Sequence, residues 1–298
     1  MLTLRNRTFT WSRPLLMGVV NVNPDSFSDP GPRTLDTVVA RALALLADGA
    51  SIVDVGAQSA ITNRPPVDAA DEAARVGPAV ERIRQACPEA VLSVDTYKPA
   101  VVEAALAAGA DLVNDVSGLA DPAVARLCAA AGAGLVVMHT SAPPLTRLQD
   151  PDRYPNGVAA EVAAFLDAKI DEAVAAGVAP DAVVVDPGVD FTKTPGQSVA
   201  LLRGIDRIVA LGRPMLLALS RKDFVGALTG RPPSRRDAGT LGAVAALAGV
   251  PGQILRVHDV AAVHDFLTVR SAIEGPDEPD LSLALANDLR HERPERKA

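Results

Sequence analysis

The sequence predicts an eight-stranded parallel β/α barrel, the TIM (β/α)8 architecture, in a single α/β domain. Short β-branched apolar runs alternate strictly with Ala- and Leu-rich amphipathic stretches, and eight such units follow one another within about 250 residues. No change of composition divides the chain into two halves, which argues against a doubly wound sheet with a second domain.

Each expected element follows from its own pattern. The expected strands are Leu15–Val22, Ser51–Ala57, Val91–Thr96, Asp111–Val116, Gly134–Thr140, Ala182–Pro187, Pro214–Ser220 and Gln253–Asp259. The expected helices are Asp36–Gly49, Ala69–Cys87, Pro99–Gly109, Asp121–Gly132, Val158–Gly177, Gln197–Gly212 and a closing His264–Glu274. Five of them end in glycine, the residue that most readily adopts the left-handed conformation of a helix C-cap: Gly49, Gly109, Gly132, Gly177 and Gly212.

The two ends of the chain differ from the repeating middle. Arg5–Trp11 precedes the first barrel strand and is expected to cap the bottom of the barrel. The barrel domain is expected to span residues 1–275. Residues 276–298 are rich in Pro, Asp, Glu and Arg, a composition typical of a disordered tail.

Composition excludes several classes of function. The 298 residues are 48% hydrophobic and 22% charged, enough to bury a substantial core, while the net charge of −7 argues against general binding to nucleic acid or an anionic membrane. Cys87 and Cys128 fall in helical stretches and are expected to be free thiols. No apolar run reaches the roughly 20 residues of a membrane span, and the N-terminus lacks a signal-peptide core. A cytoplasmic protein is expected.

Polar residues stand at the end of every expected strand. Each one alone is more often a helix cap or turn former than a functional group. Because the carboxyl ends of barrel strands all meet at one face, eight polar ends together predict a site there. They are Asn21, Asp54, Asp95, Asn114 with Asp115, Met138 with His139, Asp186, Ser220 to Lys222, and Arg256 to Asp259.

The residue types at these ends indicate two kinds of recognition. Asp95, Asn114 and Asp186 can accept hydrogen bonds from a planar ligand edge that carries adjacent N–H donors. Four further residues suit an anionic group such as phosphate: Asn21, Lys222, Arg256 and His258. No P-loop or GxGxxG fingerprint follows a strand, so nucleotide binding of those types lacks support.

Six segments closely resemble, in the same order, the signature segments of dihydropteroate synthases. They are Asn21–Asp29, Ser93–Lys98, Asn114–Leu119, Asp186–Gly188, Ser220–Lys222 and Arg256–Asp259, and the resemblance spans about residues 14 to 275. It implies a transferase of folate biosynthesis that condenses 6-hydroxymethyl-7,8-dihydropterin pyrophosphate with p-aminobenzoate, forming dihydropteroate and pyrophosphate.

The resemblance also implies roles for individual residues. Those implied to bind substrate are Asp95, Asn114, Met138, Asp186, Phe191, Lys222, Thr62, Arg64, Arg256 and His258. Those implied to be catalytic are Asn21, Asp25, Lys222, Arg256 and His258, with Asn21 also near a Mg²⁺ cofactor that neutralises the departing diphosphate. The loops after the first two strands are implied to form a lid, and the late helices a homodimer.

Three loops depart from the family pattern. Where the family reads Gly-Gly-Glu-Ser-Thr-Arg-Pro, this chain has Gly56–Pro65, with Thr62 and Arg64 as shifted counterparts of the Thr-Arg pair. Gly-Phe-Gly-Lys becomes Asp190–Lys193. Asp223 replaces a serine that the resemblance places at the p-aminobenzoate carboxylate.

The departures motivate a hypothesis about the two halves of the site. The pterin and pyrophosphate residues are kept, whereas the amine side gains two acids, Asp190 and Asp223. Unless Arg64 or Lys193 compensates, repulsion from each acid weakens the binding of a benzoate carboxylate by on the order of 1 kcal/mol or more. We therefore expect an altered amine half and weak sulfonamide binding.

Two other classes of function remain open. A methyltetrahydrofolate-dependent methyltransferase shares pterin-binding strand ends, but its substrate has no diphosphate to explain Lys222, Arg256 and His258. A noncatalytic pterin-binding protein fits the altered loops but not the retained pyrophosphate residues. The barrel alone does not choose among them.

Overall fold

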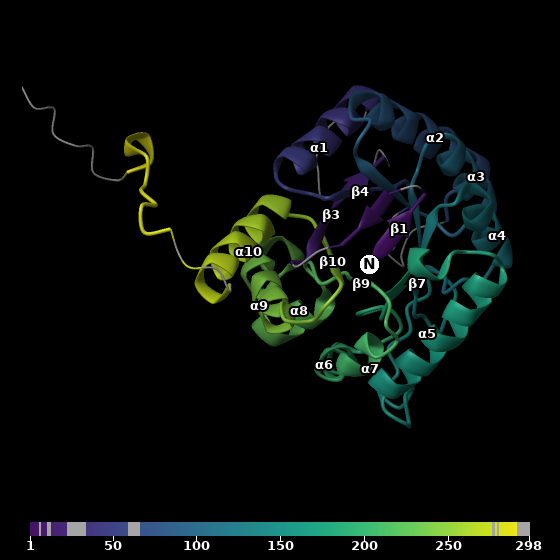
Figure 1. Ribbon diagram of the computed structural model, residues 1–298. Helices are drawn as coiled ribbons and strands as arrows, with labels where there is room; N and C mark the ends of the chain where they lie inside the picture. The colour runs from purple at the N-terminus through teal and green to yellow at the C-terminus, as the bar shows by residue number, and fades with distance from the viewer. Residues whose placement is uncertain are drawn as a thin grey trace, which may run out of the picture.

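Eight parallel strands close into a barrel in the computed structural model, in the order β10-β3-β4-β5-β6-β7-β8-β9 (Figure 1). The structure describes residues 1–5, 7–10, 13–22, 34–58, 66–275, 278 and 280–290. The barrel strands are β3 (Leu15–Asn21), β4 (Ile52–Gly56), β5 (Val91–Asp95), β6 (Leu112–Asp115), β7 (Gly134–Met138), β8 (Val183–Asp186), β9 (Met215–Leu217) and β10 (Gln253–Val257). All eight lie within the expected segments, and the predicted TIM barrel is confirmed.

The helices surround the barrel as a ring (Figure 1). Their bounds are α1 (Leu35–Ala47), α2 (Ala69–Ala86), α3 (Pro99–Ala107), α4 (Pro122–Ala131), α5 (Val158–Ala175), α6 (Pro195–Arg203), α7 (Asp206–Val209), α8 (Asp223–Thr229), α9 (Asp237–Leu247) and α10 (Val260–Glu274). Short 3₁₀ turns occupy Pro180–Ala182, Pro233–Arg235 and Asn287–Leu289. The five glycines expected at helix ends all have positive φ, between 62° and 104°.

The helix prediction needs two corrections. The single helix expected over Gln197–Gly212 is two, α6 and α7, separated at Gly204. Sequence patterning did not identify α8 and α9: α8 has only seven residues, and glycines at 239 and 242 weaken the helical signal of α9. Both helices follow the β9 end and shape the site.

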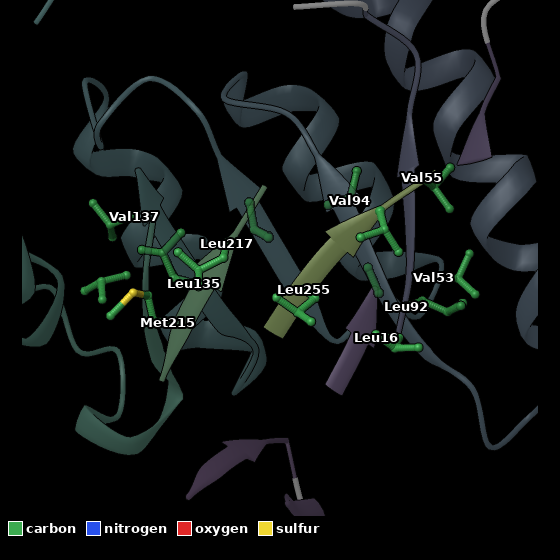
Figure 2. Packing of buried hydrophobic residues seen from close by; sticks show 14 of the residues in the cluster. Leu16, Val53, Val55, Leu92, Val94, Leu135, Val137, Met215, Leu217 and Leu255 are labelled. Atoms are coloured by element: carbon green, nitrogen blue, oxygen red, sulfur yellow. The ribbon is translucent and has the colours of Figure 1, made fainter. Parts of the chain in front are cut away.

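Successive strand residues face opposite sides of the barrel wall. Figure 2 shows the outward set, including Val53 and Val55 of β4 and Leu92 and Val94 of β5, buried in the cluster that also contains helix residues such as Val80. The residues between them form a second cluster inside the barrel, with Met17, Ile52, Val91, Leu112, Val136, Val184, Leu216 and Ile254. Because the period is two, the strand ends that continue this inner set also face the barrel interior.

An N-terminal hairpin closes the bottom of the barrel. Strands β1 (Leu2–Leu4) and β2 (Arg7–Phe9) pair antiparallel, and Leu2 and Leu4 are buried in the inner cluster. Arg5, Arg7 and Arg84 converge on the buried carboxylate of Asp111, with the Arg84 Nη2 atom 2.6 Å from Oδ2. The expected cap is therefore present, beginning three residues earlier than Arg5 and built as a hairpin.

The remaining expectations concern the surface and the tail. None of the described helices has the length and apolar character needed to cross a membrane. Cys87 and Cys128 are free, as expected. Within the expected tail, residues 276, 277, 279 and 291–298 lie outside the described part of the chain, so its disorder stays a prediction.

The contribution of the β1–β2 hairpin to the stability of the barrel can be tested by shortening one of its side chains. Leu4 is 1% exposed, and Leu4→Ala leaves a cavity among inner-cluster residues. We expect the free energy of unfolding to fall by about 2–5 kcal/mol, measured by denaturant unfolding. The matched control is Leu283→Ala at a side chain 85% exposed, with an expected change within about 0.5 kcal/mol. Equal changes in the free energy of unfolding for the two variants would contradict a hairpin that stabilises the barrel.

Candidate functional site

Strand register places polar ends in one row at the mouth of the barrel. Asn21 pairs with Gly56, Gly56 with Asp95, and Asp95 with Asn114 along β3, β4, β5 and β6. Gly56 lacks a side chain, and a Cβ there would lie 3.3 Å from the Asp95 Cβ. Further round the barrel, Met138 of β7 pairs with Asp186 of β8. The closed barrel therefore brings together residues that are far apart in sequence.

Arg256 of β10 links two carboxylates inside this mouth. Its Nε donates to Asp54 Oδ2 at 2.7 Å and its Nη2 donates to Asp95 Oδ2 at 2.7 Å. Asp54 precedes Gly56 by two residues on the same inward face, one layer deeper, and is 0% exposed. The Asn114 amide also donates to Asp54 Oδ2, at 3.3 Å. One guanidinium thus spans two layers of the barrel.

The pKa values of two acids in the mouth, Asp95 and Asp186, are raised. Burial raises the pKa of Asp95 to about 7 although Arg256 opposes the shift, and Asp54 adds to it. Burial also raises the pKa of Asp186, whose Oδ1 accepts the backbone N–H of Gly188 at 2.7 Å. For Arg256, burial lowers the pKa, but Asp54 and Asp95 more than offset it and leave the pKa raised. The cation is therefore permanent while the acids can exchange protons.

Several acceptor oxygens in the mouth have no hydrogen-bond partner within the described part of the chain. They include Asp54 Oδ1 and Asn114 Oδ1, on residues 0% and 2% exposed. A buried acceptor without a partner is costly, and a ligand that brings N–H donors removes the cost. The mouth is thus complementary to a flat edge rich in donors.

Cationic and neutral nitrogens lie at the other side of the mouth. The Lys222 Nζ sits 4.4 Å from the centre of the Phe191 ring; burial lowers the pKa of Lys222, while Asp190 and Asp186 raise it. His258 Nδ1 is 2.9 Å from Ser220 Oγ. Burial, with Arg256, Arg221 and Lys222, lowers the pKa of His258 to about 4. His258 is neutral at pH 7 until an anion changes its surroundings.

A cavity adjoins these groups. It contains about 550 Å³ of empty space, part of it open to solvent, and is lined by Asp95, Val116, Tyr97, Leu145 and Phe191 among others. Its aromatic and aliphatic walls beside polar strand ends suit a planar ring system.

The base of the loop after β4 is clamped by a lysine. Lys98 Nζ donates to Glu72 Oε2 at 2.6 Å, to Gln58 Oε1 at 2.8 Å and to the Val67 carbonyl at 2.6 Å. Gln58 Oε1 also accepts the Val67 N–H at 3.0 Å. Residues 58 and 67 on either side of the loop are thereby fixed to each other and to the start of α3.

The two acids that depart from the family pattern, Asp190 and Asp223, each have partners. Asp190 accepts from Ser198 Oγ at 2.7 Å and from the Phe224 N–H at 3.2 Å, at the start of α8. Asp223 is 61% exposed and lies 3.1 Å from Arg236 Nη1. Compensation therefore comes from Ser198, α8 and Arg236. Lys193 attracts Asp190 electrostatically but makes its hydrogen bonds elsewhere, and Arg64 lies outside the described residues.

Comparison with known proteins agrees with this geometry. A family model described as pterin binding enzyme matches residues 17–258, which include every barrel strand end except the start of β3. The chain belongs to the dihydropteroate synthase family of pterin-binding enzymes. It is similar to the dihydropteroate synthase of Mycobacterium leprae, with 44% identity over 270 residues that cover 86% of this chain and 92% of the relative.

Both active and inactive names occur among its relatives. The chain is 40% identical over 284 residues to the inactive dihydropteroate synthase 2 of Mycobacterium tuberculosis, covering 93% of this chain and 88% of the relative. Among solved structures, it is similar to Xanthomonas albilineans dihydropteroate synthase in complex with 7,8-dihydropteroate, with a TM-score of 0.81 and 39% identity over 93% of this chain and 99% of that one.

Most site residues expected from the family resemblance come together in the barrel mouth. Asn21, Asp95, Asn114, Met138 and Asp186 end neighbouring strands, and Arg256 joins them from β10. Phe191 and Lys222 stack on each other, and His258 lies beside Ser220. Asp25, Thr62 and Arg64 lie outside the described residues, so their roles stay predictions.

Sequence reasoning gave no role to Asp54 or His139, and it considered Lys193 only as a charge that could compensate the added acids. Asp54 was recognised as a polar strand end, and its isolation in the apolar run Ile52–Gly56 was the available signal of an inward-facing acid. His139 and Lys193 form a buried contact of 2.9 Å between Nδ1 and Nζ. No local sequence pattern pairs them, because they meet only after the β7 and β8 ends come together.

The expected Mg²⁺ was tested against the donors present. No group of three or more His, Cys, Asp or Glu side chains suited to a metal occurs within the described residues. Asn21 contributes an amide oxygen at the end of β3. Since Mg²⁺ usually keeps waters and substrate phosphates as ligands, one protein oxygen fits a metal carried by a diphosphate and does not fit a cage built by protein alone.

The raised pKa of Asp95 predicts a pH-dependent stability. In the folded protein this proton is held up to about pH 7, whereas the unfolded chain releases it near 3.8. Stability therefore falls as pH rises from about 4 to about 7. We expect Asp95→Asn to unfold at higher denaturant concentration than the wild type at about pH 8, with a smaller difference at about pH 5. The control is Asp265→Asn, at a carboxylate 86% exposed. A difference for Asp95→Asn that does not change with pH contradicts the assignment.

Proposed function

We propose that this chain condenses 6-hydroxymethyl-7,8-dihydropterin pyrophosphate with p-aminobenzoate or a related aromatic amine, forming dihydropteroate and pyrophosphate. The observation that carries the proposal is the set of buried acceptor oxygens at Asp54, Asn114 and Asp186 beside the Arg256 and Lys222 cations. Family membership supports the same reaction.

The acceptor oxygens supply recognition of the pterin. A pterin presents amine and ring N–H donors along one edge, which match carboxylate and amide oxygens that only accept. Asp95 and Asp186, with raised pKa values, can also take or give a proton as the ligand binds. The Phe191 ring and the cavity wall at Val116 enclose the flat ring system.

The cations supply stabilisation of the leaving group. The bond between the pterin methylene carbon and the diphosphate oxygen breaks first, the amine nitrogen then bonds to that carbon, and the nitrogen loses a proton. Arg256, Lys222 and a His258 that gains a proton beside the anion stabilise the departing charge. Mg²⁺ bound with the diphosphate and held through Asn21 would supply further neutralisation.

The amine half is proposed to differ from that of the synthases the chain resembles. Asp190 and Asp223 both lie near Lys222 and raise its pKa, so negative charge surrounds the cation on the amine side. The partners of Asp190 and Asp223 reduce the repulsion between these acids and a carboxylate on the acceptor amine, but they do not remove it. An amine without a carboxylate is therefore the better acceptor for this site.

A noncatalytic pterin-binding protein is the second candidate. The similarity to an inactive dihydropteroate synthase 2 favours it, since 40% identity covers nearly the whole chain. The retained Arg256 and His258 favour the transferase, because binding a pterin alone does not require a diphosphate site. No observation specifically favours a methyltransferase.

Two further proposals concern assembly and location. The late helices α9 and α10 border an apolar groove with Val269 and Ile273 exposed at 58% and 77%, which supports the expected homodimer. Free Cys87 and Cys128 fit the expected cytoplasmic location.

Turnover decides among the three functions. Given the pterin pyrophosphate, p-aminobenzoate and Mg²⁺, we expect one pyrophosphate released per dihydropteroate formed. Asp186→Asn should lower kcat/KM about 100-fold through the lost charge-assisted contacts, and Asp167→Asn on the exposed face of α5 should not change it. Pterin binding without pyrophosphate release establishes the noncatalytic protein. Methyl transfer from methyltetrahydrofolate establishes the methyltransferase.

Replacing Asp223 tests the amine half. Because this acid is exposed and paired with Arg236, we expect Asp223→Ser to lower the KM for p-aminobenzoate only about fivefold, and sulfonamide inhibition to tighten in parallel. The control is Asp206→Ser, which removes an exposed acid from the first turn of α7. Tight sulfonamide inhibition of the wild type, with no change on Asp223→Ser, rules out an altered amine half.

A further inference from the structure

Lys193 is the largest fully buried side chain within the described residues, and all three of its ammonium protons have acceptors. Nζ contacts His139 Nδ1 at 2.9 Å, the Gly188 carbonyl at 2.9 Å and the Phe191 carbonyl at 3.0 Å. An ammonium donates three bonds and accepts none, so this environment matches it fully. Nothing in the proposed chemistry uses this lysine.

The segment 187–192 folds around the ammonium. Gly188, Asp190 and Thr192 all have positive φ, at 66°, 65° and 52°. Phe191 N–H donates to the Gly188 carbonyl at 3.0 Å, which brings the two carbonyls that Lys193 binds to the same side. A Cβ at Gly188 would collide with the His139 carbonyl oxygen, so the segment also lies tight against the end of β7.

This segment carries or orients three groups of the site. Asp186 Oδ1 accepts from Gly188 N–H, Phe191 provides the ring beneath Lys222, and Asp190 binds the Phe224 N–H at the start of α8. Two of the three Lys193 bonds go to Gly188 and Phe191. The Lys193 ammonium therefore holds the segment that bonds Asp186, the acid proposed to bind the pterin, and that places the Phe191 ring against Lys222.

We propose that Lys193 is a positioning residue that, by holding segment 187–192 around its ammonium, sets Asp186 and Phe191 for binding the pterin ring. The proposal rests on the proposed pterin function and assigns it a residue that touches no substrate. His139 takes part as the neutral acceptor, and Tyr154 covers the ammonium with its ring centre 5.9 Å from Nζ.

The titratable groups facing Lys193 come from four parts of the chain. Asp186 at the end of β8 and Asp190 in the segment itself raise its pKa, Lys222 after β9 lowers it, and burial lowers it most, to about 7. His139 at the end of β7 has its pKa lowered to about 3 by burial and by Lys193, so the ring is neutral and its Nδ1 can accept from the ammonium. Loss of the Lys193 proton removes one of the three donated bonds.

Lys193→Met tests the role, because methionine keeps the chain length and removes the donors. The matched control is Lys169→Met on α5, where the ammonium also donates to a backbone carbonyl, that of Leu119. Binding of two probes is measured by calorimetry: 6-hydroxymethylpterin and inorganic pyrophosphate. We expect Lys193→Met to weaken pterin binding at least tenfold and pyrophosphate binding less than twofold, with Lys169→Met changing neither beyond twofold.

The outcomes separate the two levels of inference. A folded Lys193→Met protein that binds the pterin as the wild type does overturns the positioning role, and so does equal loss of both probes, which indicates a general structural defect. A wild type that binds no pterin overturns the proposed function instead.

If Lys193→Met does not fold, hydrogen exchange of the wild type decides. After correction for intrinsic rates, protection of the Gly188 and Phe191 amides should fall between about pH 6 and about pH 8.5. The Val185 amide, bonded to the Pro214 carbonyl in the barrel, should keep its protection. Pterin binding should restore protection at the higher pH. Protection that is independent of pH, or lost equally at Val185, overturns the proposal.

Discussion

The pairing of Arg256 with Asp54 and Asp95 is the interaction on which the site depends. Carboxylates from three strands face a barrel interior that water barely reaches, and ionised acids are expensive there without a cation. Arg256 is 202 positions from Asp54 in the sequence, so the two meet only when β10 pairs with β3 and closes the barrel. Closure of the fold and neutralisation of the site are therefore the same structural event.

The site divides into a part built on strands and a part built on loops. Asn21, Asp95 and Asn114 are fixed by β-sheet register, and a shift of one residue would turn them away from the interior. Asp190 lies on the loop after β8 and Asp223 is the first residue of α8, and both acids are held by side-chain bonds. Sequence change is more easily accepted on loops, and this is where the chain departs from its family. The part of the site built on strands can therefore stay fixed while the part beyond the strands changes.

How much the sequence reveals depends on how local the determining interaction is. The alternation of apolar runs and the polar strand ends predicted the barrel and its mouth, because period-two geometry acts within each strand. The role of Asp54 was missed because it lies one inward step below the strand end. The Lys193 contact with His139 joins residues 54 positions apart and carries no pattern. Short α8 and glycine-containing α9 lack the helical signal that longer elements have.

Asp190 and Thr192 stand where the family pattern has glycine. Both keep left-handed backbone angles that favour glycine, at a cost of roughly 1–3 kcal/mol each. Bonds offset that strain: Asp190 reaches Ser198 and Phe224, and the Thr192 hydroxyl accepts the Ser141 N–H at 3.1 Å. The loop thereby places the Asp190 carboxylate near Lys222, where it raises the pKa of the lysine. We therefore infer that, in the proposed reaction, the charge near Lys222 discriminates between acceptor amines.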